Sequence, residues 1–293
     1  MNSYLQTFIQ RLSFRGFTKN TVSTYKSYLN TYLTYLNGLQ LDPKDATWDI
    51  IRGFIDDIQK QRGLSDATIN LIISIIQFFH IYVLRKHWDK DEVPFRKFDH
   101  YLPYVPSPDD VTVLLNALRD NPKAYLAVCV LYATGMRLDE LCHLRCGDIR
   151  RREHRIYISK CKNRYDRYIP LTDSVRDMII GYWLSLPEDK RSDEWIFTQQ
   201  KNTGKPMDKQ WIQNALIKAR RQCNLNEKFT CHSLRHAYAT RSYENGLSLL
   251  ELQQFLGHRS INSTTIYIHL ACVQRTEVPN PLDQLMEREN HND

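Results

Sequence analysis

Residues 232–240 read HSLRHAYAT, and the spacing of His232 and Arg235 within them is the first indication of what the chain is. On a helix, residues three apart lie on one face, so this imidazole and this guanidinium can bind one anion together. The rest of the sequence must identify that anion.

The composition is that of a folded protein with a basic surplus. The chain has 293 residues, enough for two domains of ordinary size, each with its own core. It is 42% hydrophobic and 25% charged, which argues against disorder. Forty Lys and Arg against 33 Asp and Glu leave a net charge of +7, which favours a polyanionic partner such as nucleic acid.

Cysteine usage and the apolar segments bear on location. Seven cysteines without dense regular spacing indicate reduced thiols rather than a disulfide framework. Cys142, His143 and Cys146 have no second ligand pair at a suitable spacing, so we expect packing there and no metal site. The first residues lack a signal-peptide core, and residues 69–84 are short and interrupted by polar side chains. A cytoplasmic protein without a membrane span is expected.

Residues 1–100 predict an all-helical domain. Apolar residues recur at three- and four-residue steps over residues 18–38, with Asn20 or Thr21 as the N-cap and Gly38 as the C′ residue just beyond the helix. A second amphipathic helix is expected over residues 46–63. A third follows Ser65 as N-cap and continues to about Leu84, apolar enough to be the buried member of a small bundle.

A proline-rich connector separates this domain from the next. Helical periodicity lapses between residues 87 and 109, and we expect a linker over residues 101–107. A second domain over residues 108–293 then begins with Ser107 as cap, Pro108 at the first helical position, and two acids at the positive end of the helix dipole.

The second domain mixes helices with a little β-structure. Gly135 ends a buried helix, and Arg137 stands at the joint to the next helical segment. Residues 154–171 change to period two, which predicts a β-hairpin. Ser248 and Glu251 form a capping box for a helix that Gly257 closes. The expected fold class is therefore mainly α with a small β-sheet.

Four motifs acquire meaning from their order. TGMRLDEL (134–141), HSLRHAYAT (232–240), LGH (256–258) and Tyr267, nine residues after His258, together resemble the tyrosine recombinase family, also called phage integrases. The resemblance covers the second domain, and the first is similar to that family's helical core-binding domain, which has a SAM-like fold. It implies a site-specific DNA recombinase whose two domains form a C-shaped clamp on DNA.

The resemblance also assigns roles. It makes Arg137 and Arg235 the catalytic arginines, His232 their central partner, His258 the second histidine and Tyr267 the nucleophile. The hairpin lysine, counted back from the IPL at residues 169–171, is Lys162, with Lys160 as the alternative, because Cys161 and Asn163 stand where the family often has glycines. Glu140 is expected to brace Arg137.

Phosphoryl-transfer chemistry supports these roles independently. Attack on a phosphodiester builds negative charge on the non-bridging oxygens, which two guanidinium groups can stabilise without a metal or other cofactor. The tyrosine hydroxyl, with a pKa of about 10, needs a base, for which His232 is suited. Lys162 can protonate the departing 5′ oxygen, and His258 can hydrogen-bond the phosphate. The anion addressed by HSLRHAYAT is then a DNA phosphate.

The intermediate implied is a 3′-phosphotyrosine with a free 5′ hydroxyl, which conserves bond energy and needs no ATP. Phosphate contacts are expected from a basic surface formed by Arg150, Arg151, Arg152, Arg155, Lys160, Lys162, Arg164 and Arg167, and more weakly from Lys19, Lys26, Arg85 and Lys86.

The expected partner is a double-stranded recombination site, bound by four protomers on two duplexes, with accessory factors or a second recombinase as possible additions. The tail, residues 279–290, suits docking on a neighbouring protomer nearly as well as packing on its own domain.

Two alternatives stay open. A type IB topoisomerase has a similar catalytic core, although the short chain and the helical first domain favour a recombinase. A DNA-binding regulator could keep the fold without cleavage, but binding alone gives no reason to hold Tyr267 with this set of residues.

Overall fold

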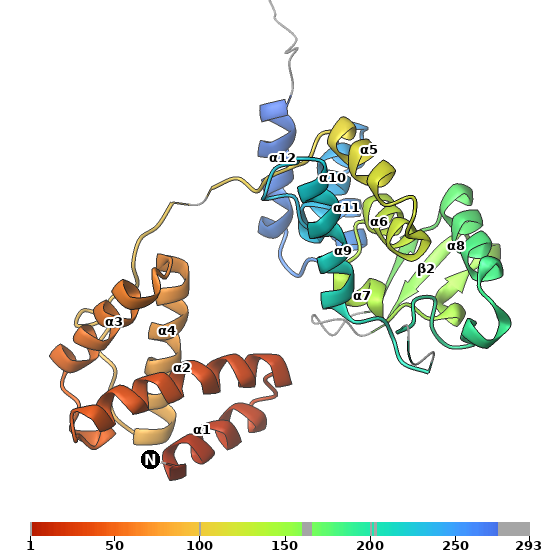
Figure 1. Ribbon diagram of the computed structural model, residues 1–293. Coiled ribbons are helices and arrows are strands. Elements are labelled where there is room, and N and C mark those ends of the chain that lie inside the picture. Colours follow the sequence, from red (N-terminus) through yellow and green to blue (C-terminus); the bar gives the residue numbers. More distant parts are fainter. Residues whose placement is uncertain (1, 100, 160–165, 200, 202–203, 275–293) are drawn as a thin grey trace, which may run out of the picture. The chain divides into compact units, whose positions relative to one another are not determined.

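The computed structural model describes residues 2–99, 101–159, 166–199, 201 and 204–274. Contacts within the chain divide it into two compact units between Tyr101 and Leu102 (Figure 1). This division falls at the start of the linker that the prolines indicated. Each unit has its own hydrophobic core.

The N-terminal unit is a bundle of helices. These are α1 (Asn2–Phe14), α2 (Lys19–Gly38), α3 (Trp48–Arg62) and α4 (Asp66–Phe79), with a 3-10 turn at Pro43–Asp45 and a π-helical turn at His80–Leu84 that extends α4. The core is formed by apolar faces of all four helices, with aromatic rings such as Phe8, Tyr32 and Phe79 fully buried. The all-helical prediction is confirmed.

The helix ends correct two predictions and confirm a third. Thr18, rather than Asn20 or Thr21, is the N-cap of α2, because its backbone is extended and its hydroxyl accepts from the Thr21 amide. Gly38 is the last residue of that helix and not the residue beyond it. Ser65 caps α4 as predicted.

The helical segment that includes α4 is apolar and longer than expected. Its 19 residues, Asp66–Leu84, are by length and composition sufficient to cross a membrane, so the prediction that this segment is too short is wrong. Half of that segment is nevertheless buried inside the unit. Ile69, Ile72 and Ile76 lie in its core, so packing within the bundle accounts for the composition.

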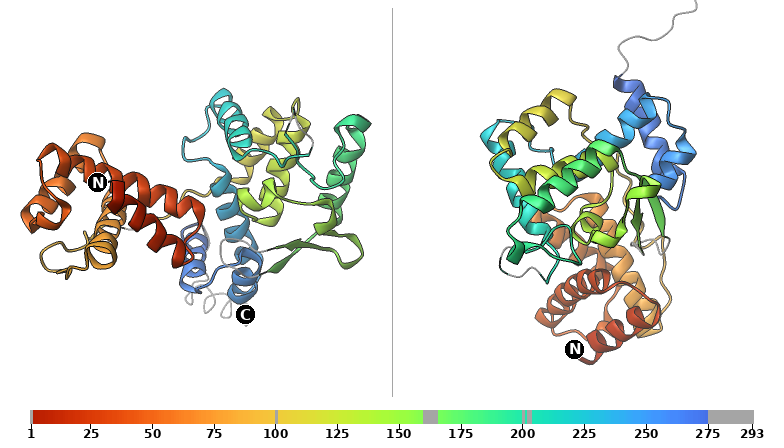
Figure 2. Two further views of the ribbon diagram at one scale, coloured as in Figure 1. Left: turned by 90° about the horizontal axis from the view of Figure 1, so that it is seen from below. Right: turned by 90° about the vertical axis from the view of Figure 1, so that its right-hand side faces the viewer.

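The second unit surrounds a buried helix. Its helices are α5 (Pro108–Ala117), α6 (Pro122–Thr134), α7 (Leu138–Cys142), α8 (Asp173–Ser185), α9 (Lys209–Gln222), α10 (Cys231–Glu244), α11 (Leu249–Leu256) and α12 (Asn262–Gln274), with 3-10 turns at Cys146–Asp148, Arg151–Glu153 and Glu188–Lys190. Helix α6 is buried on most of its surface, and α10 packs against both α6 and α12 (Figures 1 and 2).

A small antiparallel sheet completes the unit. The strands are β1 (Ile149–Arg150), β2 (Arg155–Ile158) and β3 (Arg167–Pro170), in that spatial order. The predicted hairpin is β2 and β3, with Ile156 opposite Ile169, and both side chains are buried. The short strand β1 was not predicted, because two residues are too few for period two to be visible. The combination of a helical N-terminal domain and a mainly helical second domain with a small sheet is as expected.

Candidate active site

A left-handed turn at Gly135 positions the first arginine. Gly135 has φ 60° and ends α6, and its amide donates to the Leu131 carbonyl. A Cβ at this position would come within 2.2 Å of the Tyr238 ring of α10. The chain therefore turns tightly against α10, and Arg137 follows as the N-cap residue of α7.

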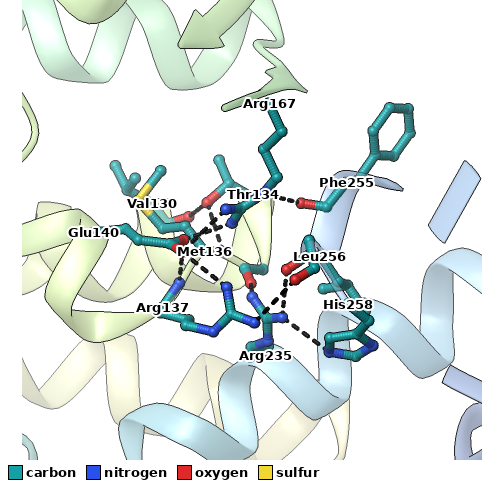
Figure 3. Close-up of polar contacts among 12 residues, drawn as sticks. Val130, Thr134, Met136, Arg137, Glu140, Arg167, Arg235, Phe255, Leu256 and His258 are labelled. Carbon is teal, nitrogen blue, oxygen red and sulfur yellow. Dashed lines mark hydrogen bonds and ion pairs between the residues drawn. The ribbon is translucent and has the colours of Figure 1, made fainter. Parts of the chain in front are cut away.

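Arg235 lies at the centre of the site. Its side chain extends from α10 into the protein, and the residue is 2% exposed. Its guanidinium donates to the Gly135 carbonyl at 2.7 Å, to the Leu256 carbonyl at 2.7 Å and to His258 Nε2 at 3.0 Å (Figure 3). Burial, reinforced by the nearby Arg137 charge, lowers the pKa of Arg235 to about 10, so it stays cationic at neutral pH.

Arg137 is the more accessible guanidinium. Its side chain is 26% exposed and pairs with Glu140 Oε1 at 2.9 Å, while the other carboxylate oxygen accepts from the Arg137 backbone amide at 2.9 Å. Arg137 Nη2 also donates to the Gly257 carbonyl at 3.3 Å. Glu140 lies where the sequence analysis expected it, against Arg137.

Arg167 is turned inward, contrary to the prediction that it contacts phosphate. Its side chain is only 8% exposed and pairs with the buried carboxylate of Glu140 at 2.6 and 3.0 Å. Its Nε also donates to the Phe255 carbonyl at 2.8 Å. Arg167 stands two residues before the buried Ile169 on β3, so period two could have placed it on the inward face.

His258 is held from both sides. Because a guanidinium only donates, Nε2 accepts from Arg235, and Nδ1 therefore carries the proton shared with the Thr264 hydroxyl at 2.9 Å. Burial and the charges of Arg235, Arg137 and Arg167 lower the pKa of His258 to about 3, so the imidazole is neutral. We expect His258 to bind phosphate, whereas in this structure both of its nitrogens contact protein.

His232 is also a neutral imidazole. It keeps an exposed edge, but the surrounding protein desolvates the ring and lowers its pKa, and Arg235 and Arg137 add to that effect. Its ring meets His236 edge-on, one helical turn later, at 4.5 Å between centroids. A neutral imidazole here can accept a proton.

Tyr267 lies inside the site rather than on its surface. The residue is 2% exposed, and its ring lies parallel to the His258 ring with 6.3 Å between centroids. The His236 ring is 5.8 Å away on the same measure. Burial raises the pKa of Tyr267, while Arg235 and Arg137 act in the opposite direction. The two guanidinium groups thus favour the phenolate against the cost of burial.

Two hollows flank these residues. One of about 1210 Å³ lies beside His258, between the sheet and α11, and is lined in part by Arg155, Tyr168 and Arg259. A smaller one of about 530 Å³ lies between α9 and α10 beside Arg137, His232 and Arg235.

The other residues singled out in the second domain fall into three groups. Arg150, Arg151 and Arg152 are exposed on β1 and the turn after it. Lys160, Lys162, Arg164 and residues 279–290 lie outside the described residues. Cys142 is buried in the core of the second unit, and within the described part of the chain no cluster of three His, Cys, Asp or Glu side chains could hold a metal.

Comparisons of the sequence with protein families give two matches. Residues 107–273 match the phage integrase family, and residues 4–90 match the SAM-like N-terminal domain of phage integrases. The chain belongs to the phage integrase family. Among its relatives, the tyrosine recombinase XerD of Oceanobacillus iheyensis is 32% identical over 87% of this chain and 89% of its own length. The putative integrase/recombinase y4qK of Sinorhizobium fredii is 30% identical over 88% of this chain and 84% of its own.

Solved structures share the fold. A lambda integrase dimer bound to a COC′ core site has a TM-score of 0.75, at 20% identity over 96% of this chain and 80% of that one. The Tn1549 transposon integrase in complex with transposon right end DNA has a TM-score of 0.73, at 19% identity over 99% of both chains. Because its relatives include a named tyrosine recombinase, this member of the phage integrase family is a tyrosine-type site-specific DNA recombinase.

Proposed function

We propose that this recombinase cuts and rejoins DNA through Tyr267, which forms the 3′-phosphotyrosine link. The observation that carries the proposal is the meeting of Arg137, Arg235, His232, His258 and Tyr267, from α7, α10, α12 and the end of α11, at one place in the fold. Single residues of these types are common, but two cations beside a buried phenol favour its ionised form.

The two arginines stabilise the transition state. The scissile phosphate gains negative charge as the phenol oxygen attacks phosphorus, and guanidinium donors held in advance stabilise that charge without reorganising. Arg235 is fixed by two backbone carbonyls, and Arg137 is fixed by Glu140. Arg137, with the larger exposed fraction, presents its donors to the incoming phosphate.

Two proton transfers accompany the exchange of bonds. His232, neutral because its pKa is lowered, takes the Tyr267 proton as the phenol oxygen bonds to phosphorus. The bond from phosphorus to the 5′ oxygen breaks, and Lys162 supplies a proton to that oxygen. His258 leaves Arg235 or Thr264 to contact the phosphate. Rejoining reverses these steps on a new 5′ hydroxyl, so no ATP is consumed.

DNA binding and assembly follow from the family. Solved relatives include lambda integrase as a dimer on a core site and as a tetramer on a Holliday junction. We propose that this chain likewise binds a double-stranded site in the cytoplasm, with domains 1–100 and 108–293 clamping the duplex, and assembles as four protomers on two duplexes. Arg150, Arg151 and Arg152, with Lys160 and Arg164, supply phosphate contacts.

Covalent trapping tests the proposal. The protein and its Tyr267→Phe variant are mixed with nicked duplexes tiled from the DNA that flanks its gene, then denatured, and the retained strands are sequenced. We expect retention with the unmodified protein and none with Tyr267→Phe, because the variant lacks the attacking oxygen, while gel-shift affinity changes little. Tyr132→Phe on α6 is the matched control and should trap normally.

The outcomes separate the alternatives. Equal trapping by Tyr267→Phe would remove Tyr267 as the nucleophile. Specific binding without any trapping by the unmodified protein would favour the non-catalytic regulator. Relaxation of supercoils without exchange between two sites would favour topoisomerase-like activity.

A further inference from the structure

Arg167 joins three separate segments of the second unit. It begins β3, its guanidinium pairs with Glu140 on α7 at 2.6 and 3.0 Å, and its Nε donates to the Phe255 carbonyl near the end of α11 at 2.8 Å. Figure 3 shows Arg167 extending from the strand toward both segments. Its side chain is 8% exposed and that of Glu140 is 2% exposed, so the pair is protected from water.

The carboxylate of Glu140 bridges Arg167 and Arg137. Oε1 accepts from both Arg137 Nη1 and Arg167 Nη1, at 2.9 and 3.0 Å. Oε2 accepts from the Arg137 backbone amide and from Arg167 Nη2. One buried carboxylate thus lies between two guanidiniums, and a bidentate Arg–carboxylate pair fixes orientation as well as distance.

A second, independent observation connects Arg167 to the turn that carries His258. Gly257 has φ +65°, and a Cβ on it would lie 3.0 Å from Arg167 Nη1 and 3.1 Å from its Cδ. The Arg167 side chain therefore packs closely on Gly257, whose carbonyl accepts from Arg137. The position of Arg167 therefore bears on both Arg137, which we propose binds the phosphate, and His258.

We propose that Arg167 is a positioning residue. It holds Arg137 and the Gly257–His258 turn at a fixed distance and orientation, so that the groups that bind the phosphate do not move relative to one another. The proposal rests on the proposed function of Arg137. Arg167 touches no reacting atom in this arrangement and acts through Glu140 and the Phe255 carbonyl. Because Arg167 is also the first residue of β3, it connects that strand of the hairpin to the same phosphate-binding groups.

The test compares two substrates for Arg167→Lys. One is a nicked duplex with an ordinary scissile phosphate, and the other carries a neutral methylphosphonate there, in which methyl replaces one non-bridging oxygen. Lysine keeps the charge but loses the planar fork. We expect the single-turnover cleavage rate on the ordinary phosphate to fall by roughly 10- to 100-fold, with unchanged DNA affinity, as is typical when a supporting contact is lost.

On the methylphosphonate, the deficit of Arg167→Lys relative to the unmodified protein should shrink to within about threefold, because there is less charge for Arg137 to stabilise. Arg176→Lys is the matched control: Arg176 on α8 also pairs with carboxylates, those of Asp173 and Asp177, outside the site. It should match the unmodified protein on both substrates.

Two results would overturn the inference. Equal deficits on the two substrates would mean that Arg167 supports the fold generally, and an unchanged rate would mean that it positions nothing. If Arg167→Lys unfolds below the assay temperature, Glu140→Gln decides in its place and must show the same dependence on substrate. Failure of the unmodified protein to trap DNA would contradict the proposed function instead.

Discussion

Gly135 shows how much of the site depends on single residues. The left-handed φ of 60° and the Tyr238 ring leave no room for a Cβ, and the Gly135 carbonyl accepts from the buried Arg235. One residue thus ends α6, admits the close approach of α10 and accepts a hydrogen bond that helps to hold Arg235. The requirement is conformational, so no side-chain chemistry at position 135 could replace it.

Gly135→Ala tests that requirement. We expect it to destabilise the second unit by about 1–3 kcal/mol, because it adds both a strained φ and an overlap with Tyr238. Gly181→Ala in α8, where a Cβ meets nothing within 4 Å, is the control and should be neutral or stabilising. Denaturant unfolding measures both. A Gly135→Ala protein as stable as the unmodified one would contradict the account.

At the scale of elements, both candidates for the general acid, Lys160 and Lys162, lie in the sequence between β2 and β3. Ile158 and Arg167 form the last described pair of the ladder, and the Arg167 side chain is buried, while residues 160–165 lie outside the described residues. A lysine ammonium can give a proton to a leaving oxygen, which is the role we propose for Lys162.

Lys162→Ala tests which lysine is the acid. We expect its cleavage rate on an ordinary phosphodiester to fall by about 100-fold or more, in the range for loss of a general acid. A substrate whose 5′ bridging oxygen is sulfur should restore the rate, because a thiolate leaves without a proton. Lys160→Ala should behave as the unmodified protein. The reverse pattern, with loss and rescue in Lys160→Ala, would transfer the role to Lys160.

At the scale of the whole molecule, both units bury histidines in neutral form. Burial is the largest cause in lowering the pKa of His80 in the N-terminal unit to about 4, and that of His236 and His258 in the second unit to about 4 and about 3. His80 lies among the rings of Trp48 and Trp88. The unfolded chain, with ordinary histidine pKa values near 6.5, binds these protons at a higher pH than the folded one.

The sign of the pH dependence follows. Stability from these histidines is fully present above about pH 6.5 and is lost as the pH falls toward 4, because unfolding then takes up protons. We expect the midpoint temperature of thermal unfolding to decrease as the pH is lowered from 7.5 to 5. His80→Phe, which keeps an aromatic ring, should reduce this pH dependence for the N-terminal unit. Calorimetry across that range measures it. A midpoint independent of pH would contradict the prediction.

Local signals explain why much of this chain could be predicted. Caps such as Ser65, Ser107 and Ser248, and the glycines that end helices, act over four residues, so the sequence determines where elements begin and end. Thr18 was missed because three neighbouring polar residues could each cap α2. The resemblance carried by the motifs selected Arg137, His232, Arg235, His258 and Tyr267, and the fold brings these residues together.

From the amino-acid sequence we could predict the element types, the division into two parts, the family and the candidate catalytic residues, because these depend on local propensity and on characteristic motifs. Three features are visible only in the folded chain: Arg167 turns inward onto Glu140, His258 contacts Arg235 and Thr264, and Tyr267 is buried. Each of them depends on contacts between segments far apart in the chain. Only folding fixes which donors and acceptors a buried charge finds.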